Sequence, residues 1–287
     1  MTPLDSPSDP AASRLRVRAI QVAYDDTESM ADRVDRVVDL VRAQRGADLV
    51  VLPELWAPGY FTFDAWADRA ETLDGPTVSA LAAAAADIGA VVHLGSLLER
   101  EPGRPVDTKA PVGGRGLWNT SVVIGPDGAV LDSYRKVHPF GFGEGEPNLI
   151  DPGTEAVTLA IPTASGSTVI AGLATCYDLR FPELFRELSA AGADLFLVPA
   201  AWPAARREHW ETLGRARAIE NQAFVVQVNT GGTHGGVELG GSSQIVSPQG
   251  EVLARAGAGE DVLAVDLDLD ALAAYRRSFP VLADRRR

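Results

Sequence analysis

The chain contains an internal repeat, and this feature constrains its fold more than any other. Residues 46–53 (GADLVVLP) recur as residues 192–199 (GADLFLVP). Residues 124–131 (IGPDGAVL) recur, in the same order along the chain, as residues 246–253 (VSPQGEVL). The first pair has the apolar pattern of a buried strand, and the second pair has the Pro-X-Gly centre of a hairpin turn. Although each pattern is common by itself, their shared order predicts an α/β protein of two similar halves, with packed sheets and outer helices.

Apolar spacing and turn residues predict the elements within each half. The signals for helices are valines three and four residues apart, a glycine just after the helix, or a proline at its start. The predicted helices are residues 29–44, 77–88, 182–191 and 206–221. The predicted strands are short apolar or alternating runs: residues 15–22, 48–52, 91–97, 119–124, 129–134, 169–174, 195–198, 224–228, 243–247 and 251–255.

Size and charge limit the class of protein. A chain of 287 residues with 46% hydrophobic residues is long enough for one large domain. We expect this domain at residues 14–270, between a disordered lead at 1–13 and an extension at 271–287. The net charge of −13 argues against nucleic-acid binding. No apolar run approaches the roughly 20 residues that span a bilayer, and one cysteine forms no internal disulfide. We therefore expect a soluble, cytoplasmic protein.

The two halves differ at charged positions that follow the repeated segments. Glu54 follows the first buried strand, whereas Ala200 occupies the equivalent place in the second half. The first hairpin continues into Arg135 and Lys136, whereas the second continues into the neutral residues 256–258. Because the shared scaffold does not require Glu54 and Lys136, their presence indicates chemistry.

Cys176 is the single cysteine and stands just after the predicted strand 169–174. A buried packing role is one reading, since free cysteine is often buried. The other is a nucleophile, with Glu54 as the base that takes the thiol proton and Lys136 as a cation that stabilises an oxyanion. His138 is a competing base, although a hydrogen bond that holds its loop is the alternative role.

The remaining histidines and glycine-rich runs indicate no cofactor. His93 lies within a predicted strand, and His209 and His234 lack the spacing of a zinc site. Residues 113–116 and 231–236 match no phosphate-binding motif, so we interpret them as loops near a site mouth or on the surface. We therefore expect neither a metal nor an organic cofactor.

Three sequence blocks resemble the nitrilase superfamily of carbon–nitrogen hydrolases over about residues 15–269. The blocks are residues 52–54 (LPE), 134–138 (YRKVH) and 176–183 (CYDLRFPE). The resemblance implies a four-layer α-β-β-α sandwich and a Glu-Lys-Cys triad, with Glu54 as general base, Lys136 as oxyanion stabiliser and Cys176 as nucleophile. It also implies a second glutamate, Glu144 or Glu146, and the spacing to residues 152–153 favours Glu146.

The residues after the nucleophile narrow the implied activity. True nitrilases usually carry Trp-Glu there, whereas this chain has Tyr177 and Asp178. The block resembles the omega-amidase and deaminated-glutathione amidase group, as does the segment 198–203 (VPAAWP). This resemblance implies hydrolysis of a small, carboxylate-bearing amide through a thioester. The candidate substrate-binding residues are Tyr60, Phe142, Glu144, Tyr177, Arg180 and Trp202.

Several alternatives remain at this stage. Arg180 could instead pair with Asp178 or Glu183. A carbamoyl (ureide) hydrolase or a nitrilase would use the same triad, and a non-catalytic scaffold could retain the fold. The predicted helix 206–221 and the segment after Asp266 are candidate subunit contacts for a homodimer or a higher even homo-oligomer.

Overall fold

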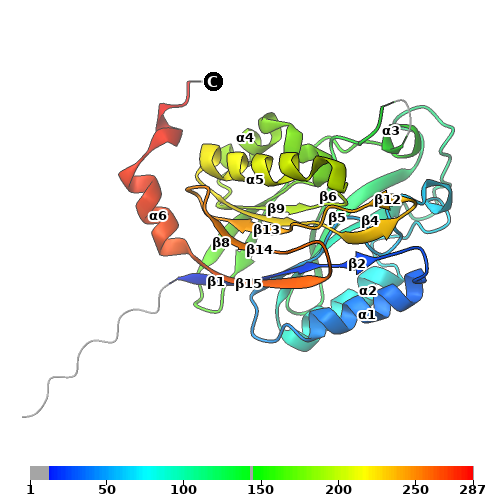
Figure 1. Ribbon diagram of the computed structural model, residues 1–287, viewed down its shortest axis with the longest axis horizontal. Coiled ribbons are helices and arrows are strands. Elements are labelled where there is room, and N and C mark those ends of the chain that lie inside the picture. Colours follow the sequence, from blue (N-terminus) through cyan, green and yellow to red (C-terminus); the bar gives the residue numbers. More distant parts are fainter. Residues whose placement is uncertain (1–12, 143–144, 287) are drawn as a thin grey trace, which may run out of the picture.

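Two β-sheets face each other, with helices on both outer faces (Figure 1). The computed structural model describes residues 13–142 and 145–286. The predicted lead at 1–13 therefore lies outside the described residues except for Ser13, and Glu144 and Arg287 lie outside them entirely. The layer order confirms the predicted four-layer α-β-β-α sandwich.

The first sheet belongs to the N-terminal half and has the order β15-β1-β3-β4-β5-β6. Its strands are β1 (Arg14–Gln21), β3 (Leu49–Val51), β4 (Val91–Arg100), β5 (Leu117–Ile124), β6 (Val130–Arg135) and β15 (Asp261–Asp268). Helices α1 (Met30–Arg42) and α2 (Pro76–Ile88) cover its outer face. The Ser29 side chain caps α1 by accepting the Asp32 N–H, and α1 buries Val37, Val38 and Val41 against the sheet.

The second sheet has the order β14-β13-β10-β9-β8-β7. Its strands are β7 (Thr158–Pro162), β8 (Thr168–Leu173), β9 (Leu195–Pro199), β10 (Phe224–Val228), β13 (Gln244–Val246) and β14 (Val252–Arg255). Helices α4 (Pro182–Ala190) and α5 (Arg207–Asn221) cover its outer face. One apolar core fills the space between the inner faces of the two sheets, which holds them together.

The topology confirms the predicted repeat. From β15 to β6 and from β7 to β14, both sheets follow the same sequence of antiparallel, parallel, parallel, antiparallel and antiparallel pairings. The two repeated hairpins even share a register shift, at Ile124 in β5 and at Val246 in β13. The halves therefore have the same strand arrangement.

The structure contains elements that were not predicted, among them strands β7 and β15 and the helix α6 (Leu269–Ser278), and one predicted loop contains a strand. Strands β7 and β15 lie at sheet edges and bury few side chains, as β6 and β14 do, but they lack the Pro-X-Gly turn by which β6 and β14 were predicted. The run 231–236 was interpreted as a loop, but β11 (Gly231–His234) pairs with β2 (Ala23–Tyr24) and β12 (Val237–Glu238) in a small sheet that links the halves.

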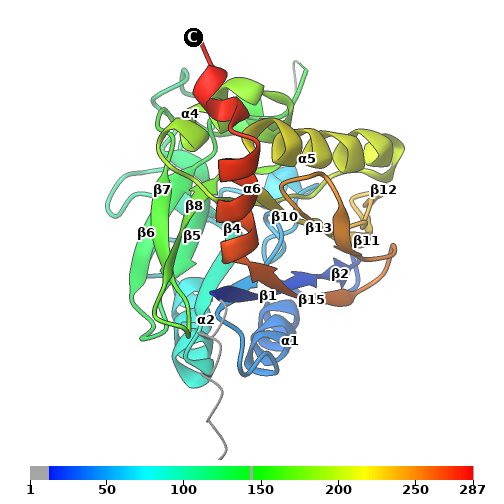
Figure 2. The same ribbon diagram turned by 90° about the vertical axis from the view of Figure 1, so that its left-hand side faces the viewer.

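Shorter elements complete the described chain. They are η1 (Phe63–Ala65), α3 (Glu146–Leu149), η2 (Cys176–Arg180), η3 (Ala204–Arg206), α6 (Leu269–Ser278) and η4 (Val281–Asp284). Helix α6 runs along one end of the sandwich (Figure 2). Its Arg276 bonds to Asp194 and to the Gln222 carbonyl. No helix within residues 13–142 and 145–286 is both long and apolar enough to span a bilayer.

Candidate active site

The ends of three strands bring Glu54, Lys136 and Cys176 together. Glu54 follows β3, Lys136 follows β6, and Cys176 follows β8 as the first residue of η2. Strands β3 and β6 run in the same direction, so their carboxyl ends lie at the same edge of the first sheet. Cys176 and Leu55 have positive φ angles of 50° and 43°. Such backbone strain in non-glycine residues concentrates at functional sites.

The Lys136 ammonium lies between two buried carboxylates. Its Nζ is 2.8 Å from Glu54 Oε1 and 2.7 Å from Glu146 Oε2, and all three side chains are fully buried. Asn119 Nδ2 donates to the Oε1 atoms of both glutamates, at 2.8 Å each. The Ala201 N–H donates to Glu54 Oε2 at 2.9 Å. These contacts fix the position of each carboxylate.

Burial and neighbouring charges determine the protonation of this cluster. Burial alone would lower the pKa of Lys136, but the charges of Glu146 and Glu54 outweigh it and raise the pKa above its ordinary value. Burial, with the charge of Glu54, raises the pKa of the Cys176 thiol well above its ordinary value despite the opposing charge of Lys136. The resting site therefore holds an ammonium ion and a neutral thiol, with the thiol close enough to Glu54 to feel its charge.

Asp178 joins the segment that carries Lys136 to the turn that carries Cys176. Its buried carboxylate accepts from the Tyr134 hydroxyl at 2.7 Å, the His138 N–H at 3.0 Å and the Thr175 N–H at 2.8 Å. The His138 ring also contacts Asp178, with Nδ1 2.7 Å from Oδ1. His138 therefore makes the predicted hydrogen bond that holds its loop, and it is not among the residues that line the cavity at Cys176.

A small cavity opens beside Cys176. Its lining residues are Tyr60, Phe61, Phe140, Cys176, Tyr177, Arg180, Ala201, Trp202, Pro203 and Arg206. Four of the predicted substrate-binding residues are thus in the lining: Tyr60, Tyr177, Arg180 and Trp202. Phe142 lies instead in an adjoining groove, where its side chain is 77% exposed, and Glu144 lies outside the described residues.

Tyr60 lines this cavity, and its hydroxyl is a buried polar group. It makes no hydrogen bond of ordinary geometry within the described residues. Burial, with the charges of Glu146 and Glu54, raises the pKa of Tyr60 well above its ordinary value. The hydroxyl therefore stays protonated and can serve a bound molecule as a hydrogen-bond donor.

Two guanidinium groups line the cavity without a carboxylate partner. Within the described residues, neither Arg180 nor Arg206 forms an ion pair, and Arg180 pairs with neither Asp178 nor Glu183. The guanidinium of Arg180 lies 4.7 Å from the Trp202 ring centroid, and that of Arg206 lies 5.5 Å from the Phe140 ring centroid. Burial lowers the pKa of Arg180, and the nearby charge of Arg206 adds to this effect. Two neighbouring cations of this kind favour an anionic ligand.

Asn119 and Arg206 are site residues that the sequence analysis missed. Asn119 could have been suspected because it opens a run of three polar residues, 119–121, within a predicted strand. Arg206 precedes the first turn of α5, where the helix dipole disfavours a cation. Neither signal shows which other residues these side chains meet.

No group of His, Cys, Asp and Glu within the described ranges has an arrangement that could hold a metal ion. His93 lies in the inter-sheet core, as predicted, where burial lowers its pKa to about 4. His209 contacts Arg180, with its Nδ1 3.3 Å from the guanidinium.

Known proteins resemble this chain over nearly its whole length. The sequence profile described as carbon-nitrogen hydrolase matches residues 16–277. A 2-oxoglutaramate amidase of Paenarthrobacter nicotinovorans is 47% identical over 96% of this chain and 91% of its own length. Omega-amidase NIT2 of Xenopus tropicalis is 32% identical over 96% of both chains.

A solved structure has the same fold. It is a CN-hydrolase superfamily protein of Xanthomonas campestris, with a TM-score of 0.82 and 32% identity over 96% of this chain and 98% of its own. The profile match, the relatives and the shared fold agree with the nitrilase superfamily resemblance of the three sequence blocks. The chain therefore belongs to the carbon–nitrogen hydrolase family, within the nitrilase superfamily.

Proposed function

We propose that this chain hydrolyses a small amide that also carries a carboxylate, of the 2-oxoglutaramate type. The products are the corresponding acid and ammonia. The chain is a cysteine-dependent amidase of the carbon–nitrogen hydrolase family. The observation that carries the substrate class is the pair of guanidiniums, of Arg180 and Arg206, in the lining of the cavity that Cys176 also lines. The relatives called 2-oxoglutaramate amidase and omega-amidase support the same class.

In the first half of the reaction, Cys176 acts as the nucleophile and Glu54 as the general base. Glu54 takes the thiol proton as the sulfur attacks the amide carbon, so no free thiolate accumulates in a site that raises the pKa of this thiol. The Lys136 ammonium and the Tyr177 N–H stabilise the oxyanion of the tetrahedral intermediate. Glu54 then returns the proton to the amide nitrogen, the C–N bond breaks, and ammonia leaves a thioester on Cys176.

In the second half, water replaces ammonia. Glu54 takes a proton from this water, whose oxygen attacks the thioester carbon, and the same cation and N–H hold the second oxyanion. The C–S bond breaks, the proton passes from Glu54 to the sulfur, and the acid leaves. Glu146 keeps Lys136 in place through its 2.7 Å contact and, with Tyr60, orients the substrate amide.

A substrate panel with two variants tests this proposal. The panel contains an omega-amide with a free carboxylate, its counterpart without the carboxylate, a carbamoyl compound and a nitrile, with ammonia release as the readout. We expect a preference for the first, a trapped acyl adduct on Cys176 in the mass spectrum, and no turnover by Cys176→Ala or Glu54→Gln. A preference for the carbamoyl compound or the nitrile would refute the substrate class. Turnover by either folded variant would refute the roles assigned here, because activity would then not depend on Cys176 and Glu54.

We also propose a single hydrolase domain over residues 14–270 in a cytoplasmic homodimer or higher even oligomer, with residues 271–287 at the subunit contact. The pairing of β15 with the whole of β1 supports the domain boundary, although residue 270 lies inside α6. The exposed apolar side chains of Ile219 and Phe279 support a contact through α5 and the segment after α6. Light scattering on Phe279→Asp tests it, since we expect dissociation to the monomer.

A further inference from the structure

His234, in the glycine-rich segment 231–236, contacts the segment that contributes Tyr60 and Phe61 to the lining of the cavity. His234 ends β11 in the second half of the chain, and its side chain is buried. Its Nδ1 accepts the N–H of Phe61 at 3.3 Å. Phe61 and its neighbour Tyr60 both line the cavity at Cys176. A residue far away in sequence thus holds the backbone of this wall.

The glycines around His234 allow this close approach. A side chain at Gly59, which has φ +80°, would have its Cβ within 2.5 Å of the His234 ring. A Cβ at Gly235 would lie 2.7 Å from the Phe61 carbonyl oxygen. The hairpin therefore contacts the 59–61 segment through its backbone as well as through the histidine, and the contact has little freedom to adjust.

We propose that His234 is a positioning residue, which holds Tyr60 and Phe61 where they shape the substrate cavity. This inference rests on the cavity's proposed role in amide binding. Tyr60 lines the cavity and has a buried hydroxyl without an ordinary hydrogen bond, and its ring contacts that of Phe61 at a centroid distance of 4.8 Å. Movement of the Phe61 backbone would therefore displace both side chains. The expected consequence is weaker substrate binding rather than slower chemistry, because Glu54 and Lys136 are held by contacts that His234 does not make.

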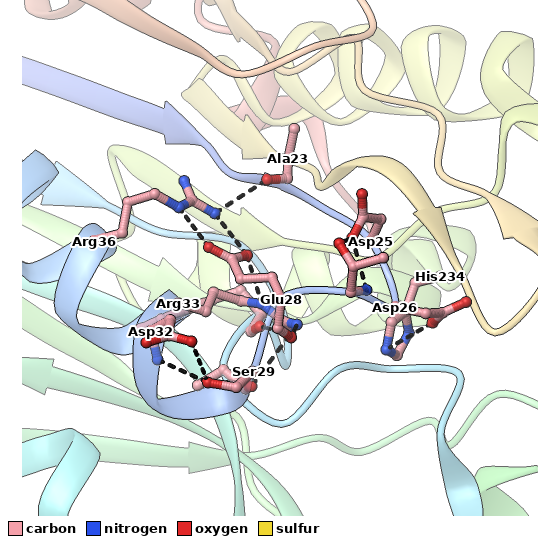
Figure 3. Close-up of polar contacts among 12 residues, drawn as sticks. Ala23, Asp25, Asp26, Glu28, Ser29, Asp32, Arg33, Arg36 and His234 are labelled. Atoms are coloured by element: carbon pink, nitrogen blue, oxygen red, sulfur yellow. Dashed lines mark hydrogen bonds and ion pairs between the residues drawn. The ribbon is translucent and has the colours of Figure 1, made fainter.

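The hydrogen bond requires an unprotonated Nδ1. The charged groups around the ring are Asp26 in the loop between β2 and α1, Arg33 of α1 and Arg69 after η1, and the ring edge meets Tyr24 of β2. Figure 3 shows Asp26 beside the His234 ring, and its carboxylate lies 3.7 Å from Nε2. Burial lowers the pKa of His234, and Arg33 and Arg69 reinforce this against the opposing charge of Asp26. The acceptor is thus present at neutral pH and is lost once the ring is protonated.

Two substitutions of His234 separate positioning from a general structural role. His234→Leu removes the acceptor, whereas in His234→Asn the amide oxygen occupies the place of Nδ1 and does not titrate. We expect His234→Leu to raise KM for the preferred omega-amide about fivefold with kcat nearly unchanged, since one hydrogen bond is worth about 1 kcal/mol. His234→Asn restores KM, and its KM does not rise at acidic pH as that of the natural enzyme does. Thr233→Ala, an exposed neighbour on the same strand, is the matched control.

Hydrogen exchange gives a readout that does not depend on the substrate. We expect the backbone amides of residues 59–63 to exchange faster in His234→Leu than in the natural protein. In His234→Asn we expect them to exchange as slowly as in the natural protein. Should His234→Leu fail to fold, the Asn variant and the pH dependence of exchange in the natural protein still decide the matter. Unchanged KM and unchanged exchange at 59–63 in His234→Leu would overturn the proposal, as would an Asn variant that behaves like the Leu variant. Absence of omega-amide turnover in the natural enzyme would overturn the proposed function alone.

Discussion

Replacement of Lys136 by Met removes the positive charge between two buried carboxylates. Glu54 and Glu146 would then face each other without the ammonium that lies 2.8 Å and 2.7 Å from them. Asn119 would still donate to both, but an amide carries no net charge. The variant should therefore be less stable, because an uncompensated charge remains in a fully buried site, and it should also be far less active.

The two contacts set the size of the effect. With an effective dielectric constant of about 20, each contact is worth roughly 6 kcal/mol of Coulomb attraction. The cost of removing the ions from water cancels most of that gain, so loss of one partner of a buried pair costs about 3–5 kcal/mol. Loss of the oxyanion cation lowers kcat by roughly a further 100- to 1000-fold in the protein that remains folded.

Urea denaturation and steady-state kinetics of three variants measure these effects. Lys109→Met makes the same chemical change at the chain's other lysine, which is exposed, and should alter the free energy of unfolding by less than about 0.5 kcal/mol. The double variant Lys136→Met/Glu146→Gln also removes one of the two negative charges that would repel each other. It should therefore be more stable than Lys136→Met, with an equally low kcat. If Lys136→Met is as stable as Lys109→Met, or if the second substitution restores no stability, the buried charge cluster does not have the energetics described here.

Two further predictions concern binding and pH. Arg206→Ala should raise KM for an omega-amide with a carboxylate by about tenfold or more, since hydrogen bonds to charged groups are worth about 1.5–3 kcal/mol. The same variant should leave KM for the amide without the carboxylate unchanged. Equal effects on both substrates would exclude recognition of the carboxylate by Arg206. Burial lowers the pKa of His93 to about 4 from about 6.5 in the unfolded chain, so the unfolded state binds more protons between these values. Above pH 6.5 His93 is neutral in both states and does not reduce the free energy of unfolding. As the pH falls from 6.5 to 4, the preferential protonation of the unfolded state lowers this free energy by about 3 kcal/mol. His93→Asn, which keeps an acceptor for the Gly95 N–H, should reduce this slope in acid denaturation, and an unchanged slope would contradict the assignment.

The fold could be predicted because its signals are local and repeated. The octapeptides at 46–53 and 192–199 became β3 and β9, and the two Pro-X-Gly turns became matching hairpins with matching register shifts. Edge strands β7 and β15 escaped prediction because they bury few side chains and have no Pro-X-Gly turn, which is the signal that revealed the edge strands β6 and β14. The pairing of β15 with β1 joins the two ends of the domain, and no local signal indicates such a contact.

The site could be predicted only in part. Glu54, Lys136 and Cys176 were identified because they break the symmetry of the repeat or follow a buried strand. Spacing favoured Glu146 as the second glutamate, and Lys136 contacts it in the structure. Phe142 shows the limit of such reasoning: it was a candidate substrate-binding residue but lies in the groove that adjoins the cavity, because the sequence does not determine where a loop side chain points.

The sequence alone determined the two-half α/β architecture, the three strand ends that carry the charged groups and the thiol, and the resemblance to amidases. These features depend on periodicity, turn chemistry and short motifs, which are properties of neighbouring residues. Only the tertiary structure decided that Asn119 bridges the two glutamates, that Arg206 joins Arg180, and that His234 of one half holds Phe61 of the other. These pairs depend on distances of a few ångströms between separate elements, and such distances are set by the packing of the whole core.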